Sequence, residues 1–257
     1  MAPAVAASPK LELGRVLGGT FRAIRQNWPW MLALGLPLAF APRAFSYWLL
    51  GLQAVRAMSH PGTVWALILS ELIGVAVDLV PGAIFAALVC LGLAARLHGQ
   101  RPAGGVGWIP SLLAGALIGT AGEMLGFLLL VIPGFILGLA WTVFTPVLVL
   151  ERKGPIDSLR TSANLTRSHR WTIAGVWLIS WLIYLAIFYG AGLPARALWF
   201  AVSPAARPWI YWAEYGIGAC AGMLYVLVWR TAATIIYFEL VRLKSGAPAE
   251  GLAAVFD

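Results

Sequence analysis

Long runs of apolar residues dominate the chain, and short polar segments separate them. A helix that crosses the hydrocarbon core of a bilayer needs about 20 predominantly apolar residues. The pattern therefore predicts an all-α fold, a polytopic transmembrane helix bundle with about six spans plus amphipathic interfacial helices. It forms a single integral membrane domain over residues 1–257. The predicted spans cover residues 30–53, 63–97, 109–130, 133–150, 171–192 and 211–236.

Two of the apolar runs are longer than a single span requires. The run at 63–97 is predicted as one tilted helix kinked at Pro81, although two short spans would also fit its length. The run at 109–150 is too long for one span, and Pro133 and Gly134 divide it. We expect two antiparallel spans there, joined by a tight turn on the outer side of the membrane.

Two segments outside the spans have amphipathic character. Residues 8–27 start with a serine and a proline, a helix-start signal, and then place apolar residues on one helical face. This helix is expected to lie in the cytoplasmic interface or to pack on the protein's own cytoplasmic side. Residues 151–170 are predicted to form a basic cytoplasmic amphipathic loop, and 245–257 a flexible tail. The apolar face of the first segment consists of Leu13, Val16, Leu17, Thr20, Phe21 and Ile24.

Composition supports lipid as the solvent of the chain. Hydrophobic residues make up 61% and charged residues 11%, with a mean hydropathy of +0.84. The net charge of +8 comes from basic residues that cluster beside the apolar runs. We interpret this charge by the positive-inside rule and expect no nucleic-acid partner. The distribution predicts a bacterial inner-membrane protein with both termini in the cytoplasm, and only Arg56, Arg196 and Arg207 on the outer side.

Ionisable residues inside apolar runs are the first candidates for a site. Glu71 and Asp78 are seven positions apart and share one helical stripe, while Glu123 lies in a glycine-rich run. Arg43 in the first predicted span is a candidate counter-ion. Charges at such depth are costly and usually face protein, water or an opposite charge. A proton or cation relay, a pocket for a polar headgroup and a buried structural ion pair all remain open.

Basic residues near the predicted cytoplasmic surface are candidate contacts for lipid headgroups. Arg230 is the least certain of them, because snorkelling to the interface would also explain it. The candidates are Arg15, Arg22, Arg25, Arg160, Arg167 and Arg230.

Glycines four positions apart recur within the spans, as at Gly122 and Gly126. Such spacing allows close helix packing, within one bundle or between two copies of the chain.

No catalytic constellation is present in the sequence. It contains no zinc-binding His-Glu-x-x-His, no Gly-x-Ser-x-Gly and no phosphate-binding glycine-rich loop. Cys90 and Cys220 lie in apolar runs and are read as packing residues. We therefore expect no catalytic residue, metal or cofactor.

The stretch 144–170 resembles a known pattern. Phe144-Thr-Pro-Val-Leu-Val-Leu-Glu151 and Ser158-Leu-Arg-Thr-Ser162 are similar to segments of the glycerophosphoryl diester phosphodiesterase membrane-domain family and related bacterial multi-pass proteins. The resemblance implies a membrane domain alone, because nothing here resembles the soluble phosphodiesterase domain of some members. Its activity is not carried over. The residues that carry the likeness are Pro133, Gly134, Pro146, Glu151, Ser162, Leu165 and Tyr237.

These observations favour a non-enzymatic inner-membrane protein, a scaffold or lipid-associated module. Its expected partners are membrane lipids, above all anionic inner-leaflet lipid, and a second copy or another membrane protein is a further hypothesis. The alternative is a small transporter or channel that uses the intramembrane carboxylates. An enzyme acting on a lipid headgroup is a weaker alternative.

Overall fold

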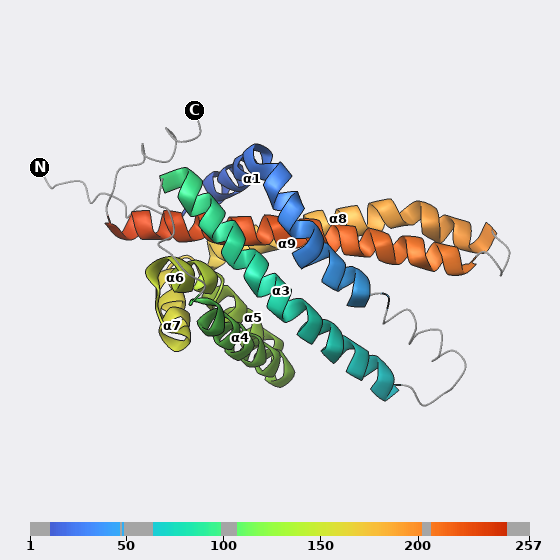
Figure 1. Cartoon of the computed structure of the whole chain (residues 1–257), viewed down its shortest axis with the longest axis horizontal. Helices are drawn as coiled ribbons and strands as arrows, with labels where there is room; N and C mark the ends of the chain where they lie inside the picture. Colours follow the sequence, from blue (N-terminus) through green and yellow to red (C-terminus); the bar gives the residue numbers. More distant parts are fainter. Residues whose placement is uncertain (1–10, 47, 49–63, 99–106, 202–206, 246–257) are drawn as a thin grey trace, which may run out of the picture.

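The computed structural model describes residues 11–46, 48, 64–98, 107–201 and 207–245, which contain helices and no strand. The predicted all-α fold is confirmed. Five of these helices, one of them interrupted, are long and apolar enough to cross a membrane. The elements are α1 (Leu13–Gly35), η1 (Leu36–Phe40), α3 (Val64–His98), α4 (Ile109–Leu129), α5 (Val131–Ala140), α6 (Phe144–Glu151), α7 (Pro155–Thr166), α8 (Arg170–Ala201) and α9 (Arg207–Ser245) (Figure 1).

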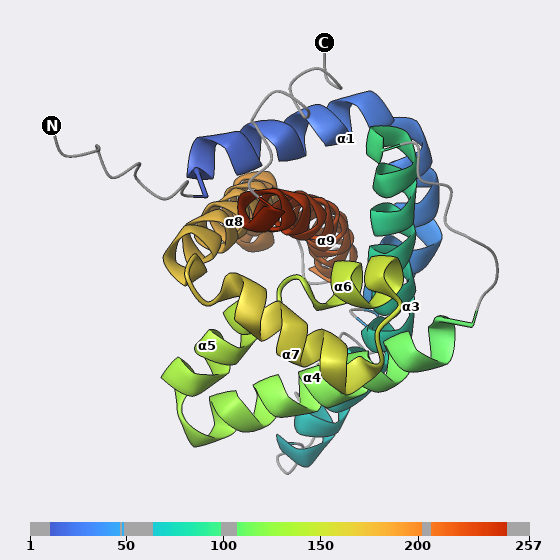
Figure 2. The same ribbon diagram turned by 90° about the vertical axis from the view of Figure 1, so that its left-hand side faces the viewer.

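The long helix α9 lies in the middle of the bundle. Seen along its axis, α8 lies beside it, α1 covers one side and α3 another, and α4 to α7 complete the ring (Figure 2). Small and β-branched residues on α9 allow this close packing on several sides at once. The main core includes Val16, Met31, Phe85, Val89, Leu93, Val143, Val147, Ile173, Val176, Ala232 and Ile236.

Helix α1 joins two elements that the sequence pattern treats separately. It runs without interruption from the predicted amphipathic segment into the first predicted span, with Pro29 inside it. Its buried stripe includes Val16, Thr20 and Ala23. Of the predicted apolar face, Val16 and Thr20 are buried, whereas Leu13 and Phe21 are 37% and 47% exposed.

The helix at 64–98 is continuous through Pro81. This settles the choice between one helix and two for the run at 63–97. The first predicted span contains the π-helical turn η1, with a proline at its start. Residues 47 and 49–53 at the end of that span, the start of the segment 8–27 and nearly all of the tail 245–257 lie outside the described residues.

Helices α4 and α5 form a hairpin whose turn is a single residue. Leu130 is extended and separates the two helices. A Cβ atom built on Gly126 would lie 2.8 Å from the Cα atom of Gly134. Only glycine at both positions permits this approach.

The predicted span 133–150 is not one helix. It is broken between α5 and α6, at residues 141–143. Pro146 explains the break, because it lacks an N–H group and its ring clashes with the carbonyl four residues earlier. The N–H of Phe144 donates to Trp141 rather than to Ala140.

The broken helix leaves a backbone acceptor that another helix satisfies. The carbonyl of Ala140 accepts hydrogen bonds from the hydroxyls of Ser162 at 2.8 Å and Thr166 at 3.2 Å, both on α7. Both hydroxyls are buried. The amphipathic helix α7 is thereby held against the break.

Removal of these two hydroxyls is expected to destabilise the fold. The double substitution Ser162→Ala with Thr166→Ala leaves the buried carbonyl of Ala140 unsatisfied, which typically costs about 1–3 kcal/mol. Unfolding in mild detergent measures the change in the free energy of unfolding. The control Ser168→Ala removes an exposed hydroxyl and should stay within about 0.5 kcal/mol of the wild type. Equal stability of the double variant and the control would contradict this role.

Candidate functional site

A cavity of about 630 Å³ with charged side chains in its wall lies between the helices. Its wall combines charged side chains with aromatic rings, and its size falls in the range of small-molecule sites. The charged members come from four different parts of the chain, namely residues 41–46, α3, α4 and α9. The polar and charged wall residues include Arg43, Ser46, Asp78, Thr120, Glu123, Thr142, Thr145, Tyr225 and Arg230.

Arg43 and Asp78 form an ion pair across the cavity wall. The guanidinium Nη2 lies 3.8 Å from the carboxylate Oδ2, and Nη1 donates to the carbonyl of Ala39 at 3.1 Å. The other oxygen of Asp78, Oδ1, is buried without a hydrogen-bond partner among the described residues. The structure therefore pairs Arg43, the predicted counter-ion, with Asp78.

A glycine on α9 makes room for this pair. A Cβ atom on Gly222 would lie 2.8 Å from Cδ of Arg43. Any larger residue there would displace the arginine from its position beside Asp78.

Arg230 faces the same cavity from α9, and Glu123 faces it from α4. The two side chains interact electrostatically, but Arg230 forms no ion pair with any carboxylate that the structure describes. Its Nε is buried and has no hydrogen-bond partner. The carboxylate of Glu123 lies near Gly138 of α5, where a Cβ atom would be 3.9 Å from its oxygen. Arg230 therefore borders the same cavity as Glu123, and the prediction that it snorkels to the interface stays a prediction.

The aromatic part of the wall is missing from the sequence-based candidates. Trp177 on α8 and Tyr225 on α9 line the cavity. The ring of Trp177 meets Phe135 edge-on at 5.3 Å and stacks on Trp181 at 6.1 Å. Aromatic residues are common in membrane helices, so their positions in the sequence do not predict that these two line the same cavity.

Glu71 belongs to α3, but its side chain lies outside the described part of the structure. Its relation to the cavity therefore stays a prediction.

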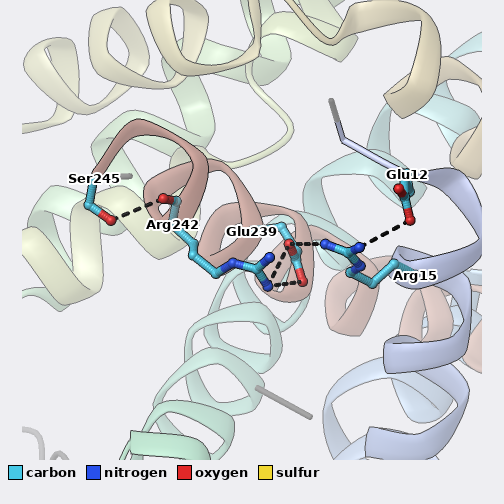
Figure 3. A network of polar contacts seen from close by, with 5 residues as sticks. All are labelled: Glu12, Arg15, Glu239, Arg242 and Ser245. Atoms are coloured by element: carbon cyan, nitrogen blue, oxygen red, sulfur yellow. Dashed lines mark hydrogen bonds and ion pairs between the residues drawn. The ribbon is translucent and has the colours of Figure 1, made fainter. Parts of the chain in front are cut away.

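A second polar cluster joins α1 to the end of α9 (Figure 3). The buried carboxylate of Glu239 lies 3.4 Å from Arg242 and 4.0 Å from Arg15, and Arg15 also contacts Glu12 at 3.1 Å. Ser245 donates to the carbonyl of Arg242 at 3.0 Å. Arg15 therefore interacts with two carboxylates of its own chain, which gives it a structural role besides the predicted contact with a lipid headgroup.

The other candidate headgroup contacts remain on the surface. Arg22 and Arg25 on α1 are exposed, as are Arg160 on α7 and Arg167 directly after it.

The residues that carry the family resemblance mostly gather around the broken helix. Pro146 causes the break, Ser162 binds the carbonyl before it, and Leu165 packs against the main core. Tyr237 on α9 donates to Glu151 at the end of α6, with an O–O distance of 3.0 Å. These contacts give that part of the sequence pattern a structural role.

Pro133 and Gly134 lie in the α4–α5 hairpin instead. Lys153 adds an ion pair to Glu151 at 2.7 Å.

The described residues hold no group of three His, Cys, Asp or Glu side chains arranged to bind a metal ion. The cavity instead offers guanidinium groups, carboxylates and aromatic faces. This set suits a polar ligand with an anionic group.

A protein-family comparison matches residues 88–240, more than half of the chain. The chain belongs to the DUF7847 family. The family is described as a domain of unknown function. Comparisons with curated proteins and with solved structures found no match. The DUF7847 region contains Glu123, Arg230 and the residues around the broken helix, whereas Arg43 and Asp78 precede it.

The Arg43–Asp78 pair should show energetic coupling. Arg43→Gln and Asp78→Asn each leave a charge in the cavity wall without its counter-ion. The loss of unfolding free energy in the double variant should therefore be about 0.5–3 kcal/mol smaller than the two single losses added together. Unfolding of all four proteins in the same detergent measures this term. Arg160→Gln combined with Asp78→Asn is the matched control and should be additive. Additivity in both cycles would contradict the pairing.

Proposed function

We propose that this chain is a non-enzymatic, lipid-associated membrane protein that holds the polar headgroup of a membrane lipid in the cavity between its helices. The observation that carries this proposal is Arg230, a cation in a cavity wall without an ion pair to any described carboxylate. Buried polar groups usually have partners in folded proteins, and charged ones above all. A ligand that brings an acceptor would complete the site.

The chemistry of the wall favours a phosphate-containing headgroup. Guanidinium groups bind phosphate through paired hydrogen bonds, and the planar fork of Arg230 can do so from one side. Glu123 and Asp78 would face a positively charged or hydroxylated part of the same headgroup. The aromatic rings of Trp177 and Tyr225 supply an amphipathic surface beside it.

The proposal includes a bacterial inner-membrane location with both termini in the cytoplasm. The bias of basic residues supports this orientation. The exposed arginines of α1 and α7 would then attract anionic lipid of the inner leaflet. The resemblance to the glycerophosphoryl diester phosphodiesterase membrane domain supports a membrane module without catalytic activity. A second copy or another membrane protein remains a proposed partner.

One observation favours a second candidate, a small transporter. The broken helix α5–α6 borders the cavity beside Glu123 and Thr142. Discontinuous helices of this kind occur at the binding sites of transporters. Substrate-dependent flux in proteoliposomes that falls in Asp78→Asn and Glu123→Gln would favour this candidate over the lipid-binding one.

Replacement of Arg230 should remove a specifically bound lipid. Native mass spectrometry of the gently purified protein, supplied with phosphatidylglycerol and phosphatidylethanolamine, should detect one phospholipid that survives removal of bulk lipid. Arg230→Gln removes charge-assisted hydrogen bonds worth about 1.5–3 kcal/mol, so the dissociation constant of the lipid should rise at least about ten-fold.

The matched control is Arg160→Gln, which removes an exposed charge on α7 and should keep the bound lipid. Thermal unfolding verifies that both variants are folded. Equal lipid retention by the wild type and Arg230→Gln would refute the headgroup site. Loss of lipid only in Arg160→Gln would place the lipid at the surface instead.

A further inference from the structure

The turn between α4 and α5 exposes five consecutive large apolar side chains. They are residues 128–132, with exposed fractions between 65% and 82%. The sequence from 124 to 140 contains no charged or polar side chain at all. Such a surface is incompatible with water as its neighbour, since exposed apolar patches of this kind mark contact with another apolar phase.

The sequence segments just before α3 and between α8 and α9 have a different composition. Residues 49–63 and 202–206 contain Gln53, Arg56, His60 and Ser203. A hairpin that crossed the whole membrane would bring its turn to the same aqueous surface. The absence of any polar residue from the α4–α5 turn argues against that destination.

The position of the hairpin leads to the same conclusion. The hairpin turn ends well short of the end at which α8 and α9 meet, and α4 to α7 all lie in the other half of the bundle (Figure 1). Viewed along α9, helix α4 is seen from its side (Figure 2). It therefore lies across the bundle axis, and its 21 residues reach less deeply than their length of about 31 Å would allow.

The backbone of the turn suits a location without water. Leu130, the one residue between the helices, donates its N–H to Gly126 at 3.0 Å and accepts from Gly134 at 3.4 Å. Pro133, near the start of α5, has no N–H to satisfy. Both backbone groups of Leu130 are therefore paired, and hydrocarbon penalises unpaired groups strongly.

We propose that the α4–α5 hairpin is a re-entrant element that enters the bilayer from the side of α7 and ends within the hydrocarbon, where lipid acyl chains surround residues 128–132. This replaces the expected pair of complete spans with a helical wedge in one leaflet. Glu123 then lies within the bilayer on α4, and α5 returns the chain to the side from which α4 entered. The proposal depends neither on the ligand of the cavity nor on the orientation of the chain.

Depth measurements on single-cysteine variants in phosphatidylcholine–phosphatidylglycerol vesicles test this topology. The exposed Cys220 is replaced by alanine, and Cys90 stays because it is buried. Leu129→Cys reports on the turn, with Trp171→Cys and Leu193→Cys as exposed apolar references toward the two ends of α8. A membrane-impermeant maleimide is applied from each side, and a nitroxide on each cysteine is probed with oxygen and a water-soluble nickel chelate.

From either side of the membrane, the maleimide should label Leu129→Cys at least ten-fold more slowly than it labels the reference cysteine nearer to that side. Its nitroxide should lie deeper in the hydrocarbon than both references. Rapid labelling from the Leu193 side, or a nitroxide depth equal to that of Leu193, would mean that the hairpin spans the membrane. Rapid labelling from the Trp171 side would place the turn in the headgroup region. Either result overturns the proposal.

Discussion

The carbonyl of Ala140 is a backbone acceptor that its own helix cannot satisfy, and the arrangement of the middle of the chain depends on how it is satisfied. Pro146 removes the helical donor to Thr142 and breaks the helix. In a low-dielectric environment an orphan acceptor is costly, so the hydroxyls of Ser162 and Thr166 hold α7 against the break. One proline therefore accounts for the change of direction between α5 and α6 and for the placement of an amphipathic helix inside the fold.

The same break shapes one wall of the cavity. Trp141 lies against Gly122 of α4, where a Cβ atom would meet its ring at 2.7 Å, and Phe144 lies against Gly115 in the same way. The aromatic rings fill the space that the glycines leave, and α4 is held beside the broken helix. Glu123, next to Gly122 in sequence, reaches the cavity as a result. The glycine pairs of α4 thus serve contacts within one bundle.

The sequence predicts the helices of this fold well, because apolar runs and prolines determine them locally. It also singles out Arg43, Asp78 and Glu123, since charges in apolar runs are rare enough to carry information. It does not show that Arg230 borders the same cavity as Glu123, because only tertiary packing brings α9 and α4 to that cavity. Trp177 and Tyr225 escape notice for the same reason, as only tertiary packing brings them to one wall.

Arg230 and Glu239 lie on the same helix and differ in how their charges are compensated. Glu239 is buried, and two arginines from α1 and α9 neutralise it, so the fold itself explains this cluster. Desolvation of such a group is offset only when its partners are complete. Arg230 has no ion pair of this kind among the described residues, although it borders a cavity large enough for a headgroup. A charge that stabilises only the fold would have been completed from within the chain, as Glu239 is. The incomplete compensation of Arg230 is therefore the reason to look for a ligand at this position rather than at the end of α9.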